Sequence, residues 1–411
     1  RDVPVFQPGR DPDGGVFVGD VPALCGWASG LDRSYVPIQG PPGTGKTFTG
    51  AHMIRTLVNA GLRVGVTAMS HAAIDNLMQA VVDRFKAEGD ADNLRAVRKA
   101  KEGSVRGIRY EDDNARVARG DFNVIAGTTW LFASKPMREN PVDVLVVDEA
   151  GQLGLADTVA ATISATNVIL LGDPQQLPQV SQATHPGGAG ASALEHLLDG
   201  ELTVPADRGV LLETTWRMHP DVCGFISDVM YGGKLHSHES CGGQSAAGQT
   251  GLRWLRAEHK GRSTESPEEA AVVVAKVEEL LGQEWTDQHG VTHRLKARDF
   301  MVVAPYNDQR RCIEAALRVN PATRGVEVGT VDKFQGREAA VVLFSMTTSS
   351  SEFMPRTAEF LFSKNRLNVA ISRARCLAYL ICTDALLDTR AEDVEEMELI
   401  SALCAFVERA A

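Results

Sequence analysis

The stretch Gly40-Pro41-Pro42-Gly43-Thr44-Gly45-Lys46-Thr47 lies between a short apolar segment and a long helical pattern. Its spacing is Gly-x-x-x-x-Gly-Lys-Thr, in which glycines let successive backbone N–H groups turn toward one anion and the next helix offers its positive N-terminal end. Lys46 can reach the β- and γ-phosphates of a nucleotide, and the Thr47 hydroxyl can ligate Mg²⁺. The stretch therefore predicts a phosphate-binding loop, with ATP and Mg²⁺ as cofactors.

Strands and helices are expected to alternate outward from this loop. Strands are predicted at 35–39, 64–68, 144–147 and 168–171, and the last two are almost continuously apolar, as parallel strands covered on both faces should be. Pro37 removes a backbone donor, so we expect incomplete pairing on one side of the first strand. A second series is predicted at 209–212, 300–304, 341–344 and 377–381. We therefore predict an α/β protein with two domains, 1–204 and 205–411, each a doubly wound parallel sheet.

Three polar segments interrupt this alternation. Residues 182–192 are expected to form a mobile loop and residues 232–251 an exposed loop rich in Gly, Ser and His. Residues 87–121 resemble a charged insertion, which contains a basic island offset only by Glu102: Arg95, Arg98, Lys99, Lys101, Arg106 and Arg109. The island is either a nucleic-acid contact or a solvated helix face.

Composition limits the classes of partner. The 411 residues carry a formal net charge of −11, so any nucleic-acid contact must come from a local groove and not from bulk attraction. The seven cysteines are scattered without a Cys-x-x-Cys pair, which argues against zinc modules and a disulfide framework and indicates reduced thiols in the cytoplasm. Because no apolar run reaches about 18 residues, we expect no membrane segment.

Two further strand ends in the first half carry polar side chains. Asp148 and Glu149 follow the apolar residues 144–147, and ligands of open α/β sheets bind where such strands end. Asp148 is the candidate Mg²⁺ anchor and Glu149 the candidate base that orients and deprotonates the attacking water, although an Asp-Glu pair can also be a helix N-cap. After residues 169–171, Gln176 is the candidate sensor of the γ-phosphate.

The second half supplies candidate arginine fingers, Arg217 and Arg373, for which ordinary surface ion pairs are the alternative. An arginine from a facing domain neutralises charge on a transferring phosphoryl group and can contribute roughly 10³ to 10⁵ in rate. Glu338, beside a glycine-containing turn, suits ribose hydroxyls.

The ordered motifs resemble those of superfamily 1B helicases of the Upf-like branch. The resemblance covers about 39–383 and rests on the phosphate loop, Asp148 to Gln152, Gly172 to Leu177, Arg217 to Pro220, Val303 to Gln309, Thr330 to Glu338 and Leu367 to Arg375. It implies two RecA-like domains with ATP between them, single-stranded DNA or RNA as partner and 5′→3′ movement. It also implies strand contacts by Thr67, Ser70, Thr129, Pro305, Tyr306 and Thr330.

The family pattern has two departures here. Trp216 stands where relatives place an adenine-stacking tyrosine and can still stack through its larger ring. No glutamine that would read the adenine edge precedes the loop, because the aligned residues are Pro22-Ala23-Leu24-Cys25.

For Tyr306 and Trp130, the alternatives are base stacking and core packing. The segment 31–38 also resembles bacterial proteins in which this motor follows a RecB-like nuclease module, so such a module is an expected partner on a longer chain.

The leading hypothesis is an ATP-dependent 5′→3′ translocase or helicase on single strands. A nucleotide-gated nucleic-acid clamp or nucleoprotein remodeller that does not separate strands is the alternative. A small-molecule kinase would use the same loop but would not need a second motif-bearing domain.

Overall fold

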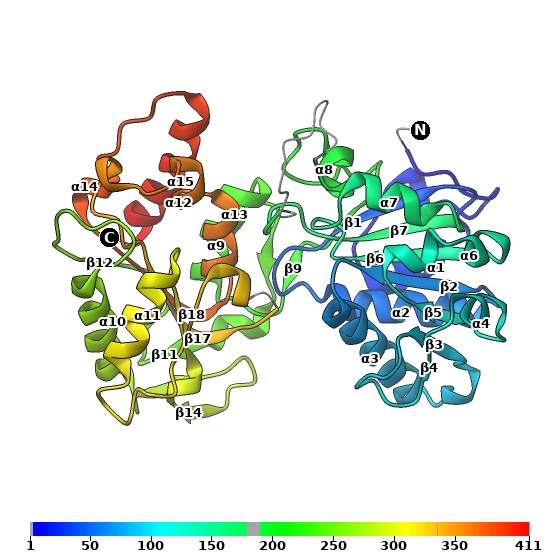
Figure 1. Cartoon of the computed structure of the whole chain (residues 1–411), viewed down its shortest axis with the longest axis horizontal. Helices are drawn as coiled ribbons and strands as arrows, with labels where there is room; N and C mark the ends of the chain where they lie inside the picture. Colours follow the sequence, from blue (N-terminus) through cyan, green and yellow to red (C-terminus); the bar gives the residue numbers. More distant parts are fainter. Residues whose placement is uncertain (1–2, 179–189, 335, 411) are drawn as a thin grey trace. The chain divides into compact units, whose positions relative to one another are not determined.

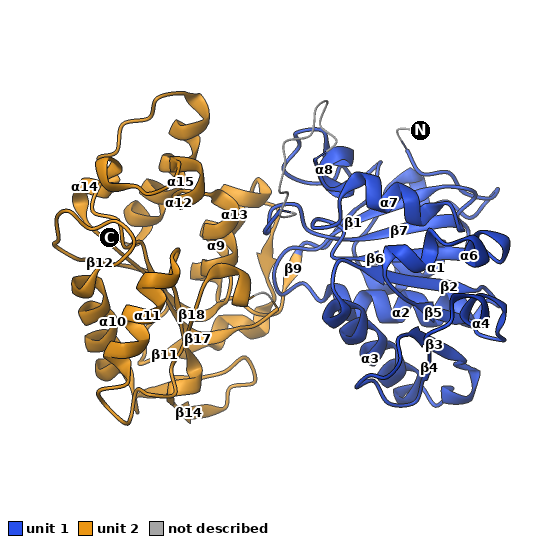
Figure 2. Ribbon diagram, in the orientation of Figure 1, with its two compact units in different colours: residues 1–213 blue, residues 214–411 orange. Residues whose placement is uncertain are grey.

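The computed structural model describes residues 3–178, 190–334 and 336–410, which divide into two compact units, 1–213 and 214–411 (Figure 1, Figure 2). Each unit is built on its own sheet with helices on both faces, so the predicted α/β class with two RecA-like, doubly wound domains is confirmed. The mobile loop predicted at 182–192 lies largely outside the described residues, as does Gln335 of the 330–338 motif.

Unit 1 contains an eight-stranded sheet in the order β4-β3-β5-β2-β6-β7-β1-β8, and every neighbouring pair is parallel. Parallel strands all end at one edge, which therefore collects the loops that follow them. The strands are β1 (Tyr35–Gln39), β2 (Val64–Ala68), β3 (Ala96–Lys99), β4 (Arg109–Glu111), β5 (Val124–Ala126), β6 (Val142–Asp148), β7 (Ala165–Gly172) and β8 (Val210–Leu211).

Helices cover both faces of this sheet. Along β6, Val144 and Val146 belong to one buried cluster and Leu145 and Val147 to another, because successive side chains of a strand point to opposite faces. The first cluster includes residues of α1 (Val21–Ala28), α2 (Lys46–Asn59) and α3 (His71–Ala87). The second includes residues of α4 (Asn114–Arg119), α5 (Thr129–Phe132), α6 (Lys135–Glu139), α7 (Leu155–Thr162) and α8 (Ala193–Leu198).

Pairing of the first strand agrees with its proline. Strand β1 pairs with β7 over its whole length, but with β8 only at Ile38 and Gln39, so the expected incomplete pairing is confirmed. Strand β8 itself was expected to open the second domain. It lies in the first sheet because Gly209 lets the chain approach β1 closely: a Cβ there would meet the Pro37 carbonyl oxygen at 2.4 Å.

The charged segment 87–121 is not an insertion outside the sheet. Strands β3 and β4 extend the sheet beside β5, and the segment's Val97 is fully buried. Arg98 is only 1% exposed, so for this residue both a nucleic-acid contact and a solvated helix face are wrong. The two-residue side-chain period places Arg98 on the face that α3 covers, opposite to Val97, where Asp75 and His71 are its polar partners.

Unit 2 contains a five-stranded parallel sheet in the order β12-β18-β17-β15-β16. Its strands are β12 (Gly251–Arg256), β15 (Phe300–Val303), β16 (Glu327–Gly329), β17 (Ala339–Ser345) and β18 (Ala374–Cys382). Its helices are α9 (Pro220–Tyr231), α10 (Pro267–Leu280), α11 (Asn307–Leu317), α12 (Ala358–Leu361), α13 (Lys364–Ile371), α14 (Asp384–Leu387) and α15 (Val394–Ala410). Residues of α10 and α11 share one buried cluster with this sheet.

Short strands complete unit 2. They are β9 (Thr214–Thr215), β10 (His236–Ser237), β11 (Ser245–Ala246), β13 (Glu284–Thr286) and β14 (Thr292–Arg294). The segment 232–251 is therefore more ordered than an exposed loop: it contributes β10 and β11 and buries Cys241 and Gln244. All seven cysteines are free thiols. No helix in the part of the chain that the structure describes combines the length and apolar character needed to cross a bilayer.

Candidate nucleotide site and nucleic-acid surface

The phosphate-binding loop joins β1 to α2 in unit 1. Gly43 and Gly45 have φ of 78° and 80°, a left-handed backbone that favours glycine. A Cβ at Gly40 would lie 2.2 Å from Lys46 Cγ, so this glycine lets the lysine stem fold back over the loop. The Lys46 ammonium donates a hydrogen bond to the Gly40 carbonyl. The predicted strand, loop and helix thus occur in sequence, with Lys46 held over the loop.

Strand β7 lies between β1 and β6, so its end separates the phosphate loop from Asp148 and Glu149 (Figure 1). Asp148 is 5% exposed, and its carboxylate accepts the Glu149 N–H at 3.0 Å. Burial, together with the Glu149 charge, raises the pKa of Asp148 to about 7, although Lys46 acts in the opposite direction. A buried carboxylate with this pKa is suited to bind a cation.

Glu149 has an unusual backbone. Its φ of 52° is left-handed, a conformation that is uncommon for residues other than glycine and occurs often at functional sites. The neighbouring Ala150 N–H donates to the Leu171 carbonyl at 2.8 Å, which fixes the turn against β7. The backbone thus directs Glu149 away from an ordinary helical start.

Two glycines that the sequence analysis assigned no role allow the loops after β6 and β7 to touch. A Cβ at Gly151 would lie 2.5 Å from the Asp173 carbonyl oxygen, and a Cβ at Gly172 would lie 2.6 Å from the Gly151 nitrogen. Both obstacles are backbone atoms, so neither can move aside easily. Their position at strand ends, Gly172 as the last residue of β7 and Gly151 three residues after β6, was the signal that could have revealed them.

Gln176 is held in place by its own loop. Its amide donates to Asp173 Oδ2 at 2.8 Å, and both residues are buried. Gln39, at the end of β1, accepts the Val204 N–H at 2.9 Å and donates to the Leu202 carbonyl at 3.1 Å. Gln39, missed by the sequence analysis, therefore ties the phosphate-loop strand to the segment that leads out of unit 1.

The predicted arginines of unit 2 lie at the amino edge of its sheet. Arg217 Nε donates to Glu338 Oε2 at 2.6 Å, and Arg375 Nε donates to Glu338 Oε1 at 3.1 Å. Burial would raise the pKa of Glu338, but Arg217 and Arg375 hold it below its usual range. Glu338 is thus engaged by two guanidinium groups from separate segments.

Arg373 and Trp216 differ in exposure. Arg373 is 2% exposed, and its guanidinium donates to the Val369 and Arg337 carbonyls at 3.1 and 3.4 Å. Trp216 is 51% exposed and stacks on His238 with ring centroids 3.6 Å apart. The predicted base-stacking ring is therefore accessible, and His238 supports it.

The predicted strand contacts lie near the carboxyl edges of the two sheets. In unit 1, Thr67 is fully buried, Thr129 is half-buried, and Ser70 is exposed and caps α3 by accepting the Ala73 N–H. Trp130 is 84% exposed, so core packing is wrong for this residue. In unit 2, Pro305 and Tyr306 are buried and Thr330 is half-buried.

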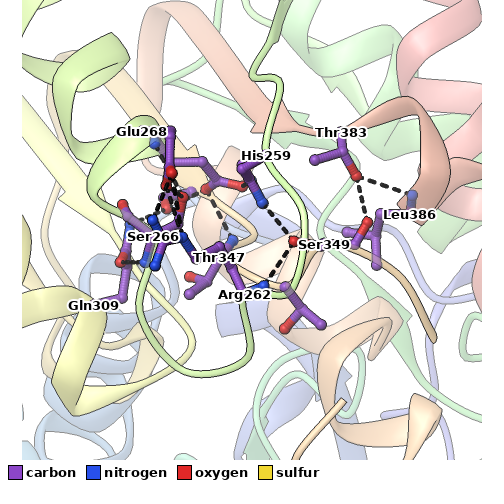
Figure 3. A network of polar contacts seen from close by, with 12 residues as sticks. His259, Arg262, Ser266, Glu268, Gln309, Thr347, Ser349, Thr383 and Leu386 are labelled. Carbon is purple, nitrogen blue, oxygen red and sulfur yellow. Dashed lines mark hydrogen bonds and ion pairs between the residues drawn. The ribbon is translucent and has the colours of Figure 1, made fainter. Parts of the chain in front are cut away.

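A buried polar network joins several loops at the carboxyl edge of the unit 2 sheet (Figure 3). His259 and Glu269 are paired at 3.0 Å with no side-chain exposure, and His259 also contacts the Ser349 hydroxyl at 2.8 Å. Glu269 accepts the Thr347 N–H at 2.8 Å. No local sequence pattern predicts this network, because residues 259–269 and 347–349 are far apart along the chain.

The network surrounds a strained turn. Thr347 has φ of 71°, and the Thr348 N–H donates to the Met346 carbonyl at 2.7 Å, as in a positive-φ γ-turn. Gln309 of α11 donates to the Ser345 hydroxyl at 3.0 Å. The network therefore fixes the loop after β17 relative to the helix that follows Tyr306.

Half of the basic island, Arg95, Arg98 and Arg109, pairs with carboxylates of unit 1. Arg98 donates to Asp75 at 2.8 Å and contacts His71 at 2.7 Å, while Arg95 pairs with Asp121 at 3.3 Å. Arg109 pairs with Glu111 at 3.6 Å, and its guanidinium carbon lies 5.7 Å from the Phe122 ring. These contacts leave less uncompensated charge than the sequence suggests.

Family models match both halves of the chain. A family model described as an AAA domain matches residues 28–192, and a second with the same description matches 190–385. The Arabidopsis thaliana DNA replication ATP-dependent helicase/nuclease JHS1 is 26% identical over 382 residues, which cover 84% of this chain and 26% of that protein. Each half of the chain is therefore similar to an AAA domain, and most of the chain is similar to part of an ATP-dependent helicase/nuclease.

Other similarities cover a comparable share of the chain. The Mesocricetus auratus DNA-binding protein SMUBP-2 is 26% identical over 421 residues, covering 84% of this chain and 40% of that protein. The crystal structure of the Arterivirus nonstructural protein 10 helicase matches with a TM-score of 0.47 and 16% identity, over 89% of this chain and 62% of that one. The chain spans between about a quarter and two fifths of the length of these two curated relatives.

Proposed function

We propose that the chain is an ATP-driven 5′→3′ translocase and helicase on single-stranded nucleic acid. The observation that carries this proposal is the shared edge of the unit 1 sheet, where Lys46, Glu149 and Gln176 follow three adjacent strands. Such an edge is where open α/β sheets bind ligands. The names of the similar proteins favour DNA as the strand.

Unit 1 would supply the hydrolytic groups. Asp148 and Thr47 would hold Mg²⁺, and the raised pKa of Asp148 fits such a role because a bound cation would favour its ionised form. Mg²⁺ would supply charge neutralisation at the β- and γ-phosphates. Glu149 would orient and deprotonate the attacking water, and Gln176, fixed by Asp173, would contact the γ-phosphate.

Unit 2 would complete the nucleotide site. Arg217 and Arg373 would stabilise charge on the phosphoryl group. Trp216 would stack on the base, and Glu338 would accept hydrogen bonds from the ribose hydroxyls. Because Arg217 is paired with Glu338 at 2.6 Å, it would exchange this carboxylate for the phosphate when the site is filled. Hydrolysis would remove that phosphate and free the two units to separate, as a two-state motor requires.

Polarity and strand separation are tested together by a displacement assay. Duplexes of identical sequence with either a 5′ or a 3′ single-stranded overhang are incubated with the chain and ATP. We expect displacement from the 5′ overhang alone, and none when Glu149 is replaced by Gln. Displacement from the 3′ overhang would refute the direction, and ATP-sensitive binding without displacement would favour a clamp.

A further inference from the structure

Two arginines of unit 2 converge on one aromatic ring at the sheet edge that carries Tyr306. The guanidinium carbons of Arg356 and Arg366 lie 4.5 and 4.3 Å from the centroid of Phe360. Phe360 in turn stacks on Tyr306 with centroids 5.7 Å apart and an interplanar angle of 25°. Since both distances meet at one centroid, the two cations are at most about 9 Å apart.

Few carboxylates neutralise this pair. Arg366 has Asp332 at 3.9 Å, a distance longer than a hydrogen bond, and no carboxylate among the described residues forms an ion pair with the exposed Arg356. The Arg366 side chain is only 22% exposed, and burial, reinforced by the charge of Arg356, lowers its pKa. A partly buried cation and an exposed cation held on one ring therefore favour binding of an anion.

We propose that Arg356 and Arg366, held on Phe360, bind a phosphodiester group of the single strand. The planar fork of each guanidinium can donate two hydrogen bonds to phosphate oxygens, and the aromatic ring restricts its orientation. This inference rests on the proposed function, because it names contacts for the same strand. It also assigns a basic contact to unit 2, in addition to the basic island of unit 1, of which only half pairs with carboxylates.

The site proposed for a phosphate of the strand differs from the site predicted for the phosphates of the nucleotide. Tyr306 follows the carboxyl end of β15, whereas Glu338 and Arg373 directly precede the amino ends of β17 and β18. The seven residues of β17 span about 23 Å at roughly 3.3 Å per residue. The Tyr306–Phe360 stack that holds the two arginines therefore lies at the carboxyl edge of the sheet and Arg373 at its amino edge, with Arg366 in the first turn of α13 and Arg373 two residues beyond its end.

The test measures binding of a fluorescein-labelled oligothymidylate by anisotropy over a series of salt concentrations. Arg356→Ala removes an exposed side chain, so we expect the fold to be retained and the affinity to fall about tenfold. The slope of log affinity against log salt should decrease in magnitude by about 0.7. Each phosphate contact releases counterions from a single strand, and the variant makes one such contact fewer. Arg366→Lys, which keeps the charge but loses the fork, should weaken binding with a smaller change of slope.

Arg318→Ala is the matched control. Arg318 is an exposed arginine of the same unit that follows α11 at the end opposite to Tyr306, so its removal should leave the slope unchanged. A fluorescent ATP analogue should bind the wild type and all three variants equally. An unchanged slope for Arg356→Ala, or the same change for Arg318→Ala, would overturn the inference, as would a selective loss of nucleotide binding. Failure of the wild type to bind the strand would refute the proposed function itself.

Discussion

Replacing Asp148 by Asn should stabilise unit 1 at alkaline pH while abolishing hydrolysis. The pKa of Asp148 is raised from 3.8 to about 7, a difference of roughly three units at about 1.4 kcal/mol each, so the ionised side chain costs about 4 kcal/mol above pH 7. Asn is neutral and can still accept the Glu149 N–H, but its amide group loses water contacts at a cost of about 1 to 3 kcal/mol. The net gain should be about 1 to 3 kcal/mol.

The sign of the pH dependence follows from the raised pKa. An acid whose pKa is raised in the folded state does not lower the free energy of unfolding below its unfolded pKa near 4. Above that pH the loss of stability grows up to about pH 7, and it is constant at higher pH. The Asn variant should therefore be more stable than the wild type at pH 8, and this difference should vanish or reverse at pH 4.5. For a unit of this size, 2 kcal/mol corresponds to a rise in Tm of about 4 to 8 °C.

Scanning calorimetry with EDTA measures this difference, and urea unfolding followed by circular dichroism checks it independently. Adding Mg²⁺ with a non-hydrolysable ATP analogue should stabilise the wild type more than the variant, because only the wild type offers the anionic ligand. An Asn variant that is no more stable than the wild type at pH 8, or equally stabilised at both pH values, would show that Asp148 carries no electrostatic penalty. That result would refute the argument for a cation site there.

Three further changes test the packing around the proposed sites. Arg98→Met should destabilise the chain by about 2 to 3 kcal/mol, because it leaves Asp75 without its buried partner. The control Arg95→Ala should cost less than about 0.5 kcal/mol. Equal effects of the two changes in urea unfolding would contradict the burial of Arg98. Gly151→Ala should abolish ATP hydrolysis, because its Cβ would separate the loops after β6 and β7. The control Gly26→Ala in α1, where a Cβ meets no atom within 4 Å, should leave hydrolysis unchanged. An active Gly151→Ala enzyme would show that the close approach of the two loops is dispensable. Glu269→Ala should cost about 3 kcal/mol, because His259 and the Thr347 N–H lose a buried acceptor, and a thermal transition at the wild-type temperature would contradict this.

The local order of elements was predictable because it depends on short-range patterns. Apolar residues 64–68 and 144–147 identified their strands, and Gly45 followed by a helical stripe identified the start of α2. Pro37 even indicated where β1 pairs incompletely. Each of these signals lies within a few residues of the feature that it predicts.

Long-range pairing was less accessible. Nothing local distinguishes Val210 and Leu211 as partners of β1, or shows that β3 extends the sheet and buries Arg98. Likewise, the long-range contacts of His259 with Ser349, of Glu269 with Thr347 and of Phe360 with Tyr306 join residues that follow different strands. Counting charges along the sequence misjudged Arg95 and Arg98, because their partners Asp121 and Asp75 are distant in sequence.

The central claim is that Lys46 and Glu149 belong to an ATP site whose turnover is coupled to a single strand. Steady-state ATP hydrolysis with and without single-stranded DNA tests it most directly, in the wild type and in the variants Lys46→Ala and Glu149→Gln. We predict that the strand stimulates the wild type and that both variants lose the stimulated rate, with Glu149→Gln still binding the ATP analogue. Strand-stimulated hydrolysis that survives either substitution would contradict the account.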